Sequence, residues 1–321
     1  MNFFCDDGST YVKLAWWEED EICTLTTGNS FRDGWKTDLF GSDKVFNFLI
    51  NGKKYTHDIA STASLETTHV NYQYSDANLL AVHCALLSSG VEPQPIDITV
   101  TLPVTEFFTE DAQPNLKNIE RKKANLLRNI ELNKGAVFSI TSVTVMPESL
   151  PAVLPSLIAD DVSSLEKSLV VDLGGTTLDC GVIVGAFESV STIKGFSEIG
   201  TSKVTQAVLH GLAEASTACS YYTADQIVRN AHDEDFLKKL INDVSHVPTI
   251  QQLIRTESRH LAGSVGNVIE NFNGIHRIYL TGGGAELIYE DIKNTFSQQK
   301  VKKIANAQLA LVTAMITSSK G

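Results

Sequence analysis

The chain has 321 residues and a mass of 35.0 kDa, with 43% hydrophobic and 20% charged residues. A chain of this length usually forms more than one hydrophobic core, and this composition excludes a disordered chain, so we expect two domains. The formal net charge of −12 opposes direct DNA binding, because affinity for nucleic acid depends on neutralisation of phosphates by Lys and Arg.

The cysteines and the hydropathy pattern indicate a cytoplasmic protein. The five cysteines are scattered, with neither a C-x-x-C pair nor a His at metal-ligand spacing, which favours reduced and buried thiols. The first residues lack the basic start and apolar core of a signal peptide. No stretch approaches the roughly 18 to 20 apolar residues of a membrane span, so we expect no membrane contact.

The first half of the chain is predicted to begin with strands and to continue with mixed elements. Its predicted elements are antiparallel strands at 2–5, 11–17 and 21–26, a hairpin at 44–59, a helix at 76–89, a strand at 96–102, a helix at 115–128, a strand at 137–145 and a linking helix at 149–158. The hairpin turns at Asn51-Gly52, a dipeptide that tolerates two positive φ angles, and belongs to an insertion at roughly 30–95. The charge-rich helix at 115–128 is expected to present a solvated face.

The second half repeats this order of strands followed by helices. Its predicted elements are a buried strand at 169–172, further strands through 184 and at 190–193, helices at 201–216, 224–242 with a break, and 249–272, a buried strand at 275–280, a helix at 285–296 and a closing helix at 304–317. Strands first and helices afterwards, twice over, indicate a duplicated α/β architecture.

One short motif occurs once in each half. Residues 4–12 (FCDDGSTYV) align without a gap with residues 170–178 (VVDLGGTTL), so that Asp, Gly and Thr coincide at three positions. In each copy an apolar strand delivers a carboxylate, and small residues then turn the chain back. Glycine allows close approach of the backbone to phosphate oxygens, and Ser and Thr add hydroxyl donors.

A carboxylate beside each phosphate-binding turn implies a cation between carboxylate and phosphate. Mg²⁺ with its retained waters is the natural candidate, held through water by Asp6 and Asp172. Either turn alone could be an ordinary turn, but the presence of both favours a phosphate site. The chain has neither a P-loop motif nor a G-x-G-x-x-G fingerprint.

Two further features are candidates for nucleotide contact. Lys13 could reach back to the β or γ phosphate, or be an ordinary exposed lysine. The cluster Gly282-Gly283-Gly284-Ala285 follows a buried strand and opens a helix, where free N–H groups could receive an α phosphate or a sugar. Taken alone, this cluster could also be a plain loop.

These three motifs resemble the first phosphate loop, the second phosphate loop and the adenosine loop of the actin, Hsp70 and sugar kinase superfamily. Within it, four stretches resemble the ParM family of plasmid-segregating bacterial actins: residues 6–10, 119–125, 146–149 and 282–288. The resemblance covers nearly the whole chain. It is weakest between Gly195 and Asn273, which leaves base and filament contacts there undefined.

The resemblance implies an α/β, actin-like ATPase fold, in which two duplicated ribonuclease-H-like domains flank a nucleotide cleft. Domain I would comprise 1–158, with a closing helix at 303–321 packing back onto it, and domain II would comprise 159–302. The implied nucleotide-binding residues are Asp6, Asp7, Gly8, Ser9, Thr10, Lys13, Gly174, Gly175, Thr176, Thr177, Gly282, Gly283, Gly284 and Ala285. The implied catalytic residues are Glu148, which would orient the attacking water, and Asp172.

The function implied by the resemblance is Mg²⁺-dependent hydrolysis of ATP, and possibly of GTP, in the bacterial cytoplasm. The chain would polymerise into paired filaments that segregate plasmid DNA through an adaptor of the ParR type, bound to a centromere-like site. Alternatives are a small-molecule kinase of the same superfamily and a nucleotide-gated scaffold with little turnover. A peptide-binding chaperone would need a further β-rich domain.

Overall fold

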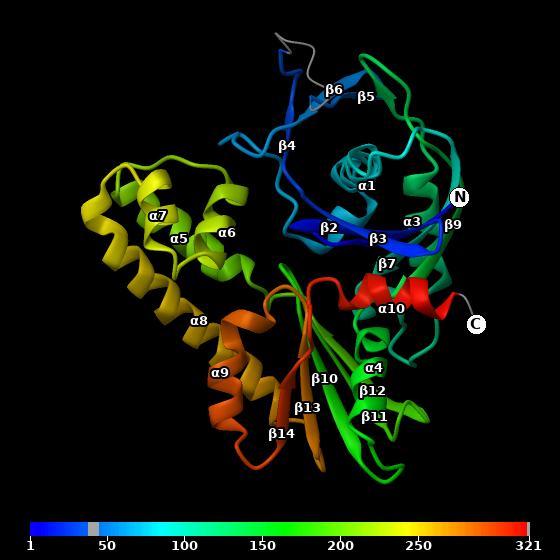
Figure 1. The fold of residues 1–321 in the computed structure, drawn as a ribbon, viewed down its shortest axis with the longest axis vertical. Coiled ribbons are helices and arrows are strands. Elements are labelled where there is room, and N and C mark those ends of the chain that lie inside the picture. Colours follow the sequence, from blue (N-terminus) through cyan, green and yellow to red (C-terminus); the bar gives the residue numbers. More distant parts are fainter. Residues whose placement is uncertain (38–44, 320–321) are drawn as a thin grey trace. The chain divides into compact units, whose positions relative to one another are not determined.

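The computed structural model describes residues 1–37 and 45–319, and the chain divides into two compact units (Figure 1). Unit 1 comprises Met1–Leu102 and Glu106–Met146, and unit 2 comprises Pro103–Thr105 and the described part of Pro147–Gly321. This division differs from the expected boundary at 158. The segment after Met146 and the last helix, α10 (Ala310–Ser318), both group with unit 2, where α10 packs on the 3₁₀ helix η2 (Leu150–Val153).

Unit 1 is built on a five-stranded sheet in the order β3-β2-β1-β7-β9. The strands are β1 (Asn2–Asp7), β2 (Tyr11–Glu18), β3 (Glu21–Gly28), β7 (Pro95–Leu102) and β9 (Ser139–Pro147). The central strand β1 pairs antiparallel with β2 and parallel with β7. Helix α1 (Asp76–Ser88) lies in the core, because every side chain from Ala77 to Leu86 is buried.

The predicted insertion supplies three strands of a smaller sheet in the order β4-β6-β5-β8, and the fourth strand, β8, comes from a later part of the chain. Its strands are β4 (Phe31–Asp33), β5 (Asn47–Ile50), β6 (Lys53–His57) and β8 (Glu131–Leu132). The hairpin turn is confirmed, since Asn51 and Gly52 have φ angles of 48° and 80°. Residue 44, at the start of the predicted hairpin at 44–59, lies outside the described residues.

Unit 2 repeats the sheet of unit 1, with the order β12-β11-β10-β13-β14. The strands are β10 (Lys167–Leu173), β11 (Leu178–Val184), β12 (Ser189–Phe196), β13 (Arg277–Thr281) and β14 (Lys300–Lys303). Its central strand β10 pairs antiparallel with β11 and parallel with β13, as β1 does with β2 and β7. The predicted duplication is therefore present in the topology, and each central strand carries one copy of the Asp-containing motif at its C-terminal end.

Five helices accompany this second sheet. They are α5 (Ser202–Glu214), α6 (Tyr221–Arg229), α7 (Glu234–Leu240), α8 (Val247–Ile269) and α9 (Ala285–Thr295). Helix α8 packs against α5 at one end and against α9 beside the sheet at the other (Figure 1). No helix within residues 1–37 and 45–319 combines the length and apolar character needed to cross a membrane.

The helices α2 (Val104–Phe107), α3 (Leu116–Leu126) and α4 (Leu154–Ala159) complete the fold. The predicted closing helix at 304–317 is shorter than expected, because residues 305–309 form a turn before α10 begins. The solvated face expected for the charged helix is incomplete, because Lys122 of α3 is fully buried. The 3₁₀ helix η1 (Val70–Tyr74) precedes α1 and contacts α3.

Candidate functional site

The first predicted loop connects β1 to β2 in unit 1. Asp6 pairs with Lys13 across the two strands, and the Lys13 Nζ lies 3.0 Å from Asp6 Oδ2. Both side chains are 12% exposed, so the ion pair is largely shielded from water. Lys13 is thus at the loop as expected, and in this structure its ammonium group neutralises the carboxylate of Asp6.

Asn29, which the sequence did not single out, holds the carbonyl groups of this loop. Its side-chain Nδ2 donates to Ser9 O at 2.8 Å, and its backbone N–H donates to Thr10 O at 2.9 Å. The Thr10 hydroxyl is buried and has no hydrogen-bond partner among the described residues. Because buried polar groups are almost always satisfied, this hydroxyl fits a ligand oxygen as its partner.

The side chain of Asp7 points away from the loop, into the core of unit 1. Its carboxylate is fully buried and forms an ion pair with Lys122. It also accepts hydrogen bonds from the side-chain amide of Asn78 at 2.6 Å and the backbone N–H of Thr101 at 3.2 Å. Among the predicted residues of the first loop, Asp7 therefore has only its backbone available to a ligand.

The second loop connects β10 to β11 in unit 2 and is closed by backbone hydrogen bonds. The N–H of Gly174 donates to Thr177 O at 2.9 Å. The chain entering α5 packs directly on this loop, since Thr201 N donates to Gly174 O at 3.1 Å and Ser202 N to Gly175 O at 2.9 Å. The N-terminal end of a 13-residue helix, where an anion is stabilised, is therefore fixed beside the loop.

The third motif meets the second within unit 2. Gly282 has a φ angle of 83°, and a Cβ atom added there would collide with Oδ1 of Asp172. The N–H of Gly284 donates to Leu173 O at 2.8 Å, which fixes the entry into α9 beside the end of β10. The structure therefore places Asp172 and the glycine cluster side by side. The sequence alone could not establish this proximity.

Asp179 is a second carboxyl group at this site that the sequence analysis missed. It lies directly opposite Asp172 in the β10–β11 hairpin. Burial, and then the charge of Asp172, raise the pKa of Asp179 to about 8. The antiparallel pairing of residues on either side of the glycine turn was the signal that could have identified it.

Helix α6 supports the glycine cluster from its other side. Arg229 donates to the carbonyl of Gly283 at 3.1 Å and forms an ion pair with Asp225, with 2.6 Å between Nε and Oδ2. The side chain of Asp225 is 2% exposed. These residues lie in the stretch where the resemblance was weakest, and the contact of Arg229 with Gly283 connects them to the site.

Glu148 follows β9 and is half-buried. The next residue, Ser149, has φ 81° and ψ −66°, and Leu150 N donates to Glu148 O at 3.1 Å. This geometry is the rare γ-turn with positive φ, which is strained for a residue with a side chain. Such strain concentrates at functional positions, so the turn is consistent with Glu148 as a candidate site residue.

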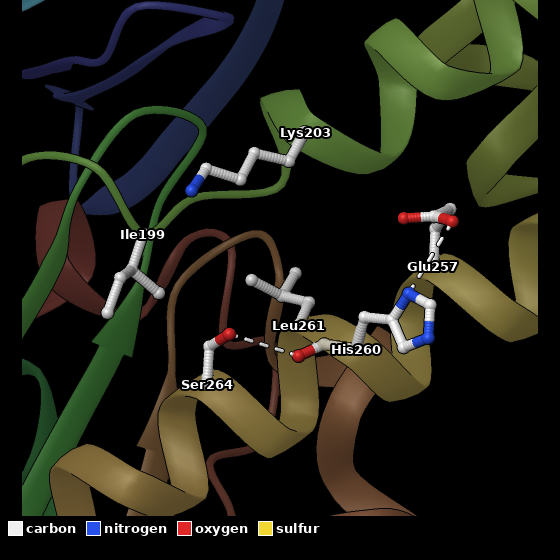
Figure 2. Close-up of a pocket in the computed structure, with 6 residues that line it drawn as sticks. All are labelled: Ile199, Lys203, Glu257, His260, Leu261 and Ser264. Atoms are coloured by element: carbon white, nitrogen blue, oxygen red, sulfur yellow. Dashed lines mark hydrogen bonds and ion pairs between the residues drawn. The ribbon is translucent and has the colours of Figure 1, made fainter.

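A small pocket in unit 2 lies beside the segment that packs on the second loop, because Ile199 and Lys203 of its lining flank Thr201 and Ser202. Its volume is about 80 Å³, and its lining residues are Ile199, Lys203, Glu257, His260, Leu261 and Ser264 (Figure 2). Sites for a whole ligand the size of a nucleotide are clefts of roughly 300 Å³ or more, so this pocket by itself would hold only part of a nucleotide. In Figure 2 the ammonium group of Lys203 points away from the pair formed by His260 and Glu257.

The described residues contain no cluster of three or more His, Cys, Asp or Glu side chains that could hold a metal ion by themselves. Mg²⁺ does not require such a cluster, because it is usually bound by one or two carboxylates together with water and substrate phosphates. Asp6 and Asp172, each at the start of a glycine turn, are donors of this kind.

Two family descriptions match this chain. "Plasmid segregation protein ParM, N-terminal" matches residues 1–159, and "Plasmid segregation protein ParM, C-terminal" matches residues 162–318. The chain belongs to the ParM family. No curated protein sequence matches it significantly.

Solved structures similar to this ParM family member share its fold across nearly their whole length. An archaeal actin homologue, Ta0583, in complex with ADP has a TM-score of 0.70 and 16% identity, covering 100% of this chain and 99% of that one. A 15-stranded ParM filament from Clostridium botulinum has a TM-score of 0.70 and 15% identity, with 99% and 98% covered. The filament structure of AlfA from a B. subtilis plasmid has a TM-score of 0.58 and 14% identity, with 98% of each chain covered. The expected actin-like fold with two domains is confirmed.

Proposed function

We propose that this chain is a Mg²⁺-dependent ATPase that polymerises with ATP, and possibly GTP, into dynamic filaments and segregates plasmid DNA. The observation that carries the proposal is the repeated loop. Each unit has the same sheet order, and in each the central strand ends in a carboxylate followed by a turn of Gly and Thr.

The proposed nucleotide ligands come from both loops and from the glycine cluster. Loop Asp6–Thr10 with Lys13, and loop Gly174–Thr177, would receive the phosphates, while Gly282–Ala285 would receive the sugar or α phosphate. The buried Thr10 hydroxyl and the contact of Gly282 with Asp172 support these assignments. Asp6 and Asp172 would hold Mg²⁺ through water.

Hydrolysis at this site would depend on position and charge. When bound, Mg²⁺ supplies charge neutralisation at the transferring phosphoryl group. Glu148 would accept a hydrogen bond from the attacking water and orient it, and Lys13 would turn from Asp6 toward the phosphates as a positive charge. The strained turn at Ser149 supports a functional role for Glu148 because it fixes the backbone beside this carboxylate.

Filament formation is proposed from family membership. Solved relatives include a ParM filament and the filament structure of AlfA, each of which covers nearly the whole of this chain. The net charge of −12 favours contact with DNA through an adaptor of the ParR type over direct binding. The cytoplasm of a bacterium is the proposed location.

Calorimetric titration with ATP and Mg²⁺ tests the site. The wild type should bind ATP, and binding should weaken when Mg²⁺ is chelated, because Asp6 and Asp172 would then face the phosphates without a cation. Asp172→Ala and Asp6→Ala should each weaken the effect of Mg²⁺. Equal binding with and without Mg²⁺ would contradict the proposed metal site, and an absence of binding would contradict the proposal as a whole.

Two alternative functions are separated by one assay. A small-molecule kinase would release little phosphate in the absence of an acceptor, and a nucleotide-gated scaffold would assemble without appreciable turnover. An ATPase of the proposed kind releases phosphate and assembles in the same sample, with ATP and Mg²⁺ as the only additions.

A further inference from the structure

A buried polar cluster lies beneath the first loop of unit 1. At its centre the Lys122 ammonium group pairs with the Asp7 carboxylate, and both side chains are 0% exposed. Lys122 also donates to the side-chain carbonyls of Gln73 and Asn78, the latter at 3.0 Å. The ion pair and its partners thus come from β1, η1, α1 and α3.

Each charged group of the ion pair has further hydrogen-bond partners. Asp7 accepts from Lys122, from the side chain of Asn78 and from the backbone N–H of Thr101 at the end of β7. Asn125, one turn after Lys122, donates to the carbonyl of Ser75 at 3.1 Å and so attaches α3 to the start of α1. A buried charge pair with full hydrogen bonding fixes one arrangement of the elements that supply it.

Such a cluster is not the simplest way to stabilise a core. Moving two charges out of water costs several kcal/mol for each ion, and apolar residues of similar volume often stabilise a core equally well. The rest of the unit 1 core is indeed apolar, with Phe3, Leu14 and Val100 fully buried nearby in the same sheet. A role in fixing geometry therefore accounts for this cluster better than a role in stability alone.

The position of Asp7 in the chain determines what the cluster fixes. Successive side chains of a strand point to opposite faces, so Asp6 faces Lys13 at the loop while Asp7 faces Lys122 in the core. Gly8 follows immediately, and a Cβ atom added to it would lie only 3.0 Å from the carbonyl oxygen of Tyr11. A rotation of the strand end that moved Asp6 or Gly8 would have to break the contacts of Asp7.

We propose that Lys122 is a positioning residue, which holds the loop Asp6–Thr10 through Asp7 in the conformation that receives the nucleotide phosphates. This inference rests on the proposed nucleotide site. The Lys122 side chain is fully buried, so it would act on binding through Asp7 rather than by contact with the nucleotide. The first loop has this support from α3, while the second loop is held by backbone hydrogen bonds from the start of α5.

The test compares Lys122→Met and Asp7→Asn with a control in the same helix. Leu126→Ala removes a side chain of α3 that is 1% exposed and lies in the apolar core, so it lowers stability without touching Asp7. All variants are compared under conditions in which tryptophan fluorescence shows them folded. The two measurements are hydrogen exchange of the backbone amides of residues 8–11 without nucleotide, and the dissociation constant for ATP with Mg²⁺.

We expect Lys122→Met and Asp7→Asn to accelerate exchange in the loop and to weaken ATP binding, each by about tenfold, the scale of a loss of preorganisation. Leu126→Ala should leave loop exchange and ATP affinity near the wild-type values, even if it lowers the unfolding midpoint as much as the two cluster variants do. Asp7→Asn keeps the volume and an acceptor oxygen, so it serves as the milder of the two variants.

Two results would overturn the inference, and a third would separate it from the proposed function. The inference is overturned if Lys122→Met and Asp7→Asn change loop exchange and ATP affinity no more than Leu126→Ala does. Failure of both cluster variants to fold where Leu126→Ala folds would assign the cluster to stability and also overturn it. If loop exchange accelerates but the wild type binds no nucleotide, Lys122 positions the loop as inferred and the proposed function is what fails.

Discussion

Asp172 and Asp179 lie directly opposite each other where β10 and β11 meet the glycine turn. Burial, and then the charge of Asp172, raise the pKa of Asp179 to about 8, which favours the protonated form of this carboxyl group at neutral pH. This direction agrees with the proposal that Asp172, and not Asp179, faces the hydrated cation.

Asp172→Ala should lower the rate of ATP hydrolysis by about tenfold or more, because one charged contact in the transition state is lost. Asp6→Ala should behave in the same way. Asp235→Ala, which removes an exposed carboxylate of α7, is the control for the change in net charge. Phosphate release measured under saturating ATP decides the matter, and near-normal turnover by Asp172→Ala would mean that the second loop is misassigned.

Glu148→Ala should still bind ATP and assemble, because orientation of water is needed for hydrolysis and not for binding. Its filaments should outlive those of the wild type as phosphate release slows. Light scattering and a phosphate assay on one sample measure both quantities. Unchanged lifetimes together with unchanged phosphate release would remove Glu148 from the mechanism.

Gly282→Ala should weaken nucleotide binding and destabilise unit 2. The φ angle of 83° is strained for alanine, and the added Cβ would collide with Asp172. Gly263→Ala is the matched control, since its Cβ would meet nothing within 4 Å in helix α8, and it should raise stability by about 0.5–1 kcal/mol. Thermal unfolding and ATP titration of both variants check the contrast, and equal behaviour of the two would contradict the close packing of Gly282 on Asp172.

His83 should make unit 1 sensitive to acid. Burial in α1 lowers the pKa of His83 to about 4, whereas the unfolded chain takes up a proton near pH 6.5. Between these values the unfolded state binds more protons, so the free energy of unfolding should fall as pH falls, by up to about 1.4 kcal/mol per pH unit.

His83→Gln should flatten this dependence between pH 6.5 and 4, and the exposed His232→Gln should not. Urea unfolding followed by tryptophan fluorescence reports on unit 1, because all three tryptophans, Trp16, Trp17 and Trp35, lie in it. The same slope in both variants would show that His83 does not titrate as its burial implies.

The elements with strong local signals could be predicted from the sequence. Alternation and turn chemistry located the first three strands and the Asn51-Gly52 hairpin, and the repeated motif indicated the duplication that the two sheets confirm. Short edge strands were missed, because β4, β8 and β14 form through pairing with distant strands and have little pattern of their own.

The candidate site was predictable where a residue acts within its own motif. Asn29 and Arg229 were missed because each reaches the site through contacts between elements that are distant along the chain. Asp179 was missed because its pairing with Asp172 across the hairpin was not considered. Lys122 was read as part of a solvated helix, since a lysine in a charged run gives no sign that it pairs with Asp7, 115 residues away. Spacing alone carries no information about such partners.

The central claim is tested most directly by sedimentation of the full chain with ATP and Mg²⁺ while phosphate release is followed in the same sample. The account predicts that the protein pellets after addition of ATP, releases phosphate, and returns to the supernatant as ATP is consumed. Without nucleotide, or with Asp172→Ala in place of the wild type, phosphate release should be low. A wild-type chain that neither pellets nor releases phosphate with ATP or GTP would contradict the account.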